Sequence, residues 1–154
     1  MTGLLIAAAW QDFRTLHIGN WLSIAIATLF GVWAALGLVE GTFSFVALGL
    51  SIACAGLLFL VGAAAFAAGM LGGGDVKLLA AIGLFAGPVQ VADLLLVTAA
   101  VGGLLGVAAL AGAPIGAVPG RGGATLRGRL RGRLPYGPAI AIGGLWVATN
   151  LAIG

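Results

Sequence analysis

Residues 43–66 read FSFVALGLSIACAGLLFLVGAAAF, an unbroken apolar run with no charged side chain. About 20 such residues in an α-helix cross the hydrocarbon core of a bilayer. Three further runs, at 20–39, 94–112 and 136–153, have a similar composition and nearly the same length. The chain is therefore predicted to be an all-α polytopic membrane protein.

The composition of the whole chain supports this prediction and excludes other classes. Of the 154 residues, 62% are hydrophobic and 7% are charged, whereas about a quarter are charged in ordinary soluble domains. The mean hydropathy is +1.21. A cytosolic enzyme, a disordered chain and a nucleic-acid-binding module all need more polar surface than this. We therefore expect residues 1–154 to form one integral membrane domain that has no nucleic-acid partner.

Two shorter apolar stretches, 3–10 and 76–86, complete a prediction of about six transmembrane helices. Residues 1–13 would extend only about 20 Å as a helix, less than a bilayer core of about 30 Å. Three explanations are open: the first helix continues past Asp12, its neighbours shield it, or the chain begins late. A signal peptide is disfavoured because no Lys or Arg precedes the stretch. The stretch at 76–86 ends at Gly87-Pro88 and is expected to borrow residues from the glycines before it.

The cationic side chains fall on one side of the predicted bundle. With alternating spans, Arg14, Lys77 and a basic loop at 113–135 share a side, and this loop holds five of the seven Lys and Arg residues. The positive-inside rule makes that side cytoplasmic and places both termini outside. We interpret the loop as a solvated connector that fixes the topology. Contact with anionic membrane lipids is the alternative, worth about 1 kcal/mol per arginine near the surface.

Asp12 and Asp75 stand out among the four carboxylates, because the predicted topology puts both at the cytoplasmic membrane boundary. Ionisable residues at membrane depth are costly and tend to face a cavity or a partner. Each has a nearby cation in the sequence, Arg14 and Lys77 respectively. Two interfacial ion pairs are therefore one interpretation of these aspartates.

The residues before Asp75 favour a different interpretation. Residues 69–74 read GMLGGG, and so many glycines are not expected to form a robust helix. A bare backbone beside a carboxylate allows another chain to approach closely, and an extended peptide can pair with such a backbone. Two carboxylates and an accessible backbone are the parts of an aspartic protease. One carboxylate, ionised, activates water, while the other, protonated, donates to the scissile carbonyl.

Three blocks of sequence, in this order, resemble the type IV prepilin peptidases. They are WQDFR at 10–14 followed by IGNWL at 18–22, GGGDVKLLA at 72–80, and LPYGPAIA at 134–141. The short form that serves tight-adherence (Flp-type) pili is the most similar. The resemblance implies a GxGD aspartic peptidase of the inner membrane that cuts the basic leader from prepilins or pseudopilins on the cytoplasmic side, after a glycine. It covers nearly the whole chain.

The resemblance also assigns roles to individual residues. Asp12 and Asp75 match the two catalytic aspartates of the family, and Gly72 and Gly74 match the glycines of its motif. Arg14 and Lys77 are candidate supporting residues. No metal or organic cofactor is implied, and the single cysteine, Cys54, excludes an internal disulfide and a Cys-cluster zinc site.

Two features separate this chain from other members of that family. Longer members carry a cysteine-rich cytoplasmic segment and also methylate the new N-terminus, so with one cysteine we expect this chain not to methylate. The family usually has proline where this chain has Gly19, which loosens the loop after Asp12.

Two alternative functions stay open at this stage. One is a noncatalytic multi-pass assembly or transport subunit whose aspartates form structural ion pairs. The other is a related protease with another substrate, such as an archaeal-type preflagellin. We also hypothesise that the arginines bind lipid or an acidic part of the pilin, so replacing Arg127, Arg129, Arg131 and Arg133 by Gln should weaken processing. Nothing in the sequence predicts an oligomeric state.

Overall fold

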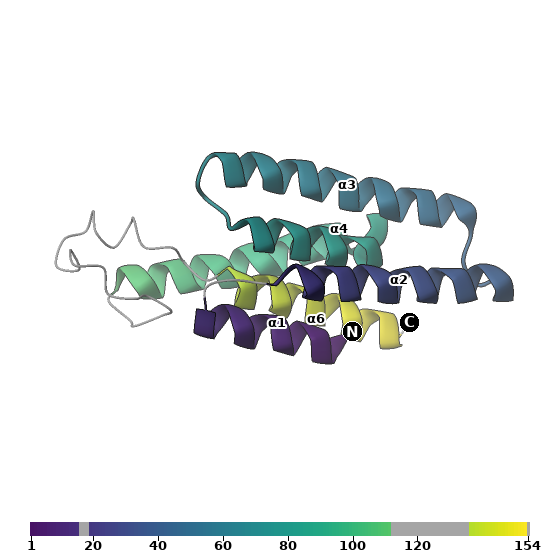
Figure 1. The fold of residues 1–154 in the computed structure, drawn as a ribbon, viewed down its shortest axis with the longest axis horizontal. Coiled ribbons are helices and arrows are strands. Elements are labelled where there is room, and N and C mark those ends of the chain that lie inside the picture. Colours follow the sequence, from purple (N-terminus) through teal and green to yellow (C-terminus); the bar gives the residue numbers. More distant parts are fainter. Residues whose placement is uncertain (16–18, 112–135, 154) are drawn as a thin grey trace.

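The computed structural model describes residues 1–15, 19–111 and 136–153, and within these ranges it is built of helices and turns. The predicted basic loop at 113–135 and the side chain of Arg14 lie outside the described residues. Figure 1 shows the helices as a long bundle. In chain order they are α1 (Thr2–Thr15), α2 (Asn20–Glu40), α3 (Phe45–Ala67), α4 (Gly73–Leu110) and α6 (Gly137–Ile153).

Three of these helices are long and apolar enough to cross a membrane: Asn20–Glu40, Phe45–Ala67 and Gly73–Ala108. Helix α6 is a shorter apolar helix. Many large apolar side chains on α2 and α3 are exposed, as expected for helices that face lipid. The predicted all-α membrane class is confirmed, whereas the number of six spans stays a prediction.

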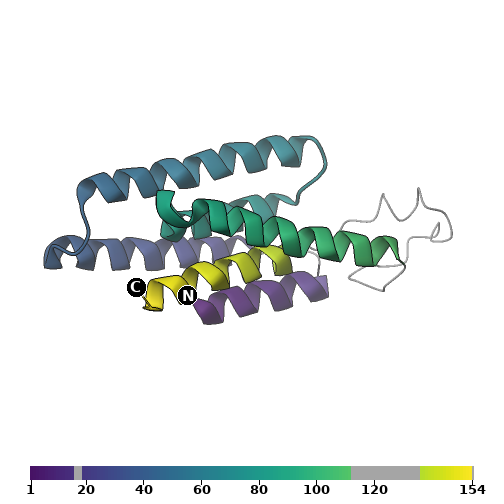
Figure 2. The same ribbon diagram turned by 180° about the vertical axis from the view of Figure 1, so that it is seen from behind.

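Helix α4 is two helices joined at a sharp break. Gly87 has φ 51° and ψ −164°, and Pro88 follows it. Only glycine adopts this backbone conformation readily, and proline cannot donate the next helical hydrogen bond. Figures 1 and 2 show that the chain reverses here and the second half of α4 runs back along the bundle. The end predicted for the short stretch at Gly87-Pro88 is confirmed.

Local hydrogen bonds set the helix ends that differ from the sequence prediction. Helix α3 begins at Phe45 rather than Phe43, because the Ser44 side chain caps it and accepts from the N–H of Ala47 at 3.1 Å. Helix α1 runs on to Thr15, which confirms that the first helix continues past Asp12. At 1.5 Å per residue its 14 residues extend about 21 Å, so it is still short for a bilayer core.

The core of the bundle forms where α6 packs between α1 and α4. Its largest fully buried side chains are apolar, and they come from both ends of the chain: Leu5, Leu22, Ile26, Leu78, Ile82, Leu94, Ile140 and Val147. Figure 1 shows both chain termini toward one end of the bundle. The end of α1 and the beginnings of α2, α4 and α6 lie toward the other end, which is where the predicted site residues fall.

Candidate active site

Asp12 lies near the end of α1 and is buried, with 4% of its surface exposed. Its Oδ2 accepts a hydrogen bond from the backbone N–H of Gly137, the first residue of α6, at 3.0 Å. A Cβ atom on Gly137 would lie 2.5–2.7 Å from Oδ2, Cβ and Cγ of Asp12. Only glycine therefore fits at this position without displacing the aspartate.

Asp75 is the third residue of α4 and is also buried, with 7% of its surface exposed. Its Oδ2 accepts from the backbone N–H of Gly72 at 3.2 Å. This is one half of a capping box, in which a carboxylate three positions into a helix binds the N–H of the residue just before it. The other oxygen, Oδ1, is buried without a hydrogen-bond partner in the described part of the chain.

The fold brings these two aspartates to a common place at one end of the bundle. Asp12 comes from the end of α1 and Asp75 from the beginning of α4, and their carboxyl groups are close enough for the charge of Asp12 to act on Asp75. In general, two carboxyl groups close together in a buried site do not both ionise readily. Such a pair supplies an acid and a base together.

The interpretation of Asp75 as the partner of Lys77 in an ion pair is wrong. The Lys77 side chain is exposed, and its ammonium donates to Oδ1 of Asn20 at 2.9 Å. Asp75 and Lys77 lie two residues apart on α4, so their side chains leave the helix in different directions. Asp75 turns into the protein, whereas Lys77 reaches across to the beginning of α2.

The glycines of the motif differ in part from the sequence prediction. Gly73 and Gly74 are helical and form the first turn of α4, although the glycine run was not expected to make a robust helix. Capping by Asp75 and the packing of the rest of α4 stabilise this turn despite the low helix propensity of glycine. Gly72 precedes the helix, and a Cβ there would lie 2.7 Å from Oδ2 of Asp75.

Gly137 is a residue of this site that the sequence reasoning did not single out. Its only signal in the sequence was membership of the LPYGPAIA block, which carried no role for a backbone N–H. No group of three or more His, Cys, Asp or Glu side chains suited to a metal comes together within residues 1–15, 19–111 and 136–153.

The geometry defines a class: a helical membrane protein with two buried aspartates at one end of its bundle. Residues 1–107 match the type IV leader peptidase family. The chain is also 36% identical over 144 residues to a prepilin leader peptidase/N-methyltransferase of Bacillus subtilis (strain 168), a match that covers 92% of this chain. The chain belongs to the type IV leader peptidase family.

The match to the Bacillus protein covers 50% of that protein, so this chain spans about half the length of the curated relative. No solved structure is similar enough to match. The matched family region, 1–107, includes Asp12, Gly72 and Asp75, while Gly137 lies beyond it.

Proposed function

We propose that this chain is an aspartic endopeptidase that removes the leader peptide of prepilins, with Asp12 and Asp75 as its catalytic pair. The observation that carries the proposal is the pairing of these two buried carboxyl groups from α1 and α4 at one end of the bundle. Membership of the type IV leader peptidase family supports the reaction class.

The pair acts by general acid–base catalysis in this proposal. The ionised carboxylate takes a proton from water as the water oxygen attacks the scissile carbonyl carbon, and the protonated carboxyl group donates to the carbonyl oxygen. The tetrahedral intermediate then collapses and the C–N bond breaks. The leaving nitrogen takes the proton that the first carboxylate removed from water, and a hydroxyl group of the intermediate returns a proton to the second carboxylate. Oδ1 of Asp75 has no hydrogen-bond partner in the described part of the chain, so it is placed to bind the attacking water.

Backbone groups hold the two carboxyl groups in this scheme. Gly137 N–H fixes Oδ2 of Asp12, and Gly72 N–H fixes Oδ2 of Asp75. Preorganised groups of this kind need no reorganisation when the reaction occurs. Gly72 and Gly74 leave the backbone beside Asp75 bare, which suits an extended peptide bound close to it.

The finer details of the proposal concern location and substrate. We propose that the protein is an inner-membrane peptidase that acts at the cytoplasmic face, with both termini outside. Lys77 at the site end of the bundle and the termini toward the other end support this orientation. The substrates are prepilins or pseudopilins of the tight-adherence (Flp-type) system, and these 154 residues do not methylate the product.

A noncatalytic role has one observation in its favour, because Asp75 also caps α4. The variant Asp12→Glu distinguishes a catalytic role of the aspartates from a noncatalytic one. The longer side chain disturbs the alignment of a catalytic pair but still carries the charge that a structural role needs. We expect Asp12→Glu to abolish cleavage while the protein still inserts into the membrane.

The experiment that tests the proposal is co-expression with a tagged Flp-type prepilin, followed by mass spectrometry of the product. The proposal expects loss of the leader after a glycine and an unmethylated new N-terminus. An intact prepilin beside a cleaved preflagellin would transfer the activity to the other substrate class. If neither substrate nor the pilin encoded beside this gene is cleaved, the noncatalytic function is favoured.

A further inference from the structure

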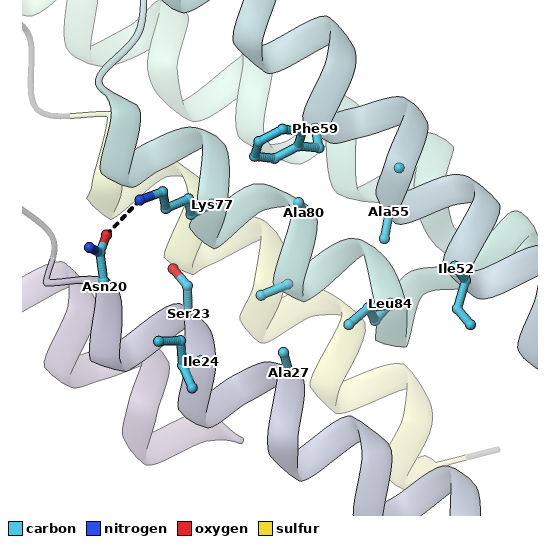
Figure 3. Close-up of a pocket in the computed structure, with 12 residues that line it drawn as sticks. Asn20, Ser23, Ile24, Ala27, Ile52, Ala55, Phe59, Lys77, Ala80 and Leu84 are labelled. Atoms are coloured by element: carbon cyan, nitrogen blue, oxygen red, sulfur yellow. Dashed lines mark hydrogen bonds between the residues drawn. The ribbon is translucent and has the colours of Figure 1, made fainter.

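A lateral groove of about 590 Å³ lies between α2, α3 and the first half of α4 (Figure 3). Two of its walls repeat one spacing, because α2 and α4 each contribute residues at i, i+3, i+4 and i+7, which share one face of a helix. These residues are Asn20, Ser23, Ile24 and Ala27 on α2, and Lys77, Ala80, Ala81 and Leu84 on α4. Ile24 and Phe59, which belongs to the third wall, are exposed, so the groove opens at the apolar surface that faces lipid.

One end of the lateral groove carries a positive charge. The Lys77 side chain is exposed, and its ammonium donates to Oδ1 of Asn20 at 2.9 Å (Figure 3). An amide oxygen is neutral, so this bond orients the ammonium without compensating its charge. Asn20 begins one helix that is long and apolar enough to cross a membrane, and Lys77 lies in the second turn of another. We therefore place both side chains at the level of the lipid headgroups.

Ser23 lies one helical turn deeper than Asn20, about 4.5 Å along the axis of α2. Its side chain lines the groove and extends from α2 toward α4 (Figure 3). It is only 7% exposed, and its Oγ has no hydrogen-bond partner within the described residues. Buried hydroxyl groups are usually hydrogen-bonded, so an occupant that brings an acceptor to this depth is favoured.

The rest of the lateral groove is apolar. Ile52 and Leu84 lie at the end away from Lys77 (Figure 3), and the seven residues from Lys77 to Leu84 correspond to about 10 Å along α4. Along this length the lining passes from a cation, through the Ser23 hydroxyl, to apolar side chains. A phospholipid has its groups in the matching order, which is a phosphate, ester oxygens and an acyl chain.

We propose that the lateral groove is a binding site for one anionic phospholipid. The lipid phosphate accepts from the Lys77 ammonium, which Asn20 holds in place. An ester oxygen one helical turn deeper accepts from Ser23 Oγ, and the first part of an acyl chain lies against the apolar side chains. Basic pockets between transmembrane helices bind acidic lipid headgroups in other membrane proteins.

Other occupants suit the lateral groove less well. An apolar helix from a second copy of this chain satisfies its own backbone hydrogen bonds, so it offers neither an acceptor to Ser23 nor an anion to Lys77. Phosphatidylcholine carries a phosphate, but its own cation compensates that charge, so Lys77 favours a headgroup with a net negative charge. Free phosphate would use Lys77 and leave the apolar walls without contact.

The first test measures lipid selectivity by native mass spectrometry of the delipidated full chain in detergent. Phosphatidylglycerol and phosphatidylcholine with identical acyl chains are compared. The wild-type protein should bind one phosphatidylglycerol about fivefold more tightly, which is the discrimination expected from one lysine near a membrane surface. Lys77→Gln should bring the two affinities to about the same value, because glutamine can still donate to Asn20 but has no charge.

The matched charge control is Arg127→Gln, which removes one cation of the predicted basic loop. This variant should keep the wild-type ratio of the two affinities. If Lys77→Gln keeps the preference for phosphatidylglycerol, or if Arg127→Gln loses it as fully, the proposal is overturned.

A second pair of variants tests the acyl-chain part of the site. Gly56 lines the groove, and a Cβ added to it would meet nothing within 4 Å, so a leucine side chain has room there. Gly31→Leu is the control, because Gly31 on α2 is equally unobstructed and lies outside the groove. The affinity for phosphatidylglycerol should fall about tenfold in Gly56→Leu only, as when about two methylene groups lose their contacts. Unchanged affinity in Gly56→Leu would overturn the proposal, since a phosphate alone would then explain the binding.

A photoreactive lipid locates the bound molecule. Phosphatidylglycerol or phosphatidylcholine with a diazirine in its acyl chain is illuminated with the protein in vesicles, and the labelled residues are identified by mass spectrometry. Phe59 lines the groove, while the neighbouring Leu60 is exposed on α3 outside it. Phosphatidylglycerol should label Phe59 more than phosphatidylcholine does, and the two lipids should label Leu60 equally. Equal ratios at both residues, or no label at Phe59, would contradict a specific site. None of these measurements requires cleavage, so their outcome is independent of the proposed function.

Discussion

The backbone N–H of Gly137 lies 3.0 Å from Oδ2 of Asp12, so the first residue of the last helix holds the carboxyl group near the end of the first helix. This bond joins parts of the chain that are far apart in sequence. The two helices also pack along each other. The position of Asp12 therefore depends on α6 as much as on α1.

Gly137→Ala should slow cleavage about 100-fold, because the added Cβ would overlap Asp12 and a displacement of about 1 Å costs that much in rate. Cleavage rate is measured against the amount of membrane-inserted protein. Gly103→Ala is the control, since a Cβ at Gly103 meets nothing within 4 Å. Wild-type cleavage by Gly137→Ala would show that Asp12 does not react from this position.

Gly72→Ala should slow cleavage by about 10- to 100-fold, because its Cβ would lie 2.7 Å from Oδ2 of Asp75 and push the carboxyl group from its place. The neighbouring Gly73→Ala is a closely matched control. Its Cβ would make ordinary contact with the Phe66 ring at 3.5 Å, and alanine favours the helix by up to about 1 kcal/mol. Equal activities for the two variants would argue against a catalytic Asp75.

Gly19→Pro should stabilise the protein by about 0.4–1 kcal/mol without loss of activity. Gly19 precedes α2 with φ −65°, which is the value that proline imposes, so the substitution restricts the unfolded chain more than the folded one. A Cβ at position 19 would lie 2.8 Å from Cδ1 of Trp21. The Trp21 side chain is exposed, so its ring can rotate away from the proline. Thermal unfolding in detergent measures the change, and a lower unfolding temperature would contradict it.

Much of the fold follows from the apolar runs. The helices at 20–39 and 43–66 were predicted to within two residues. A long apolar segment in a membrane must satisfy its own backbone hydrogen bonds, and a helix does so. The break at Gly87-Pro88 was also predicted from the local sequence, because proline lacks the N–H that a continuing helix needs. The start of α4 at Gly73 was predicted only loosely, because it depends on a cap made by the Asp75 side chain.

The site was only partly predictable, because its geometry depends on contacts between distant segments. Asp12 and Asp75 were singled out as rare charges at a membrane boundary, and the structure brings them together. The ion pair of Asp75 with Lys77 was suggested by their proximity in sequence, yet helical geometry turns the lysine toward Asn20 instead. The Gly137 N–H had no sequence signal, since any residue but proline carries that donor.

The central claim is that Asp12 and Asp75 form the catalytic pair, and the most direct measurement is cleavage of a tagged prepilin by Asp12→Asn and Asp75→Asn. Asparagine keeps an oxygen that can accept from Gly137 or Gly72 N–H but cannot supply or take up the proton. We predict normal membrane insertion and a rate at least about 100-fold below wild type for each variant. Wild-type cleavage by either inserted variant would contradict the account.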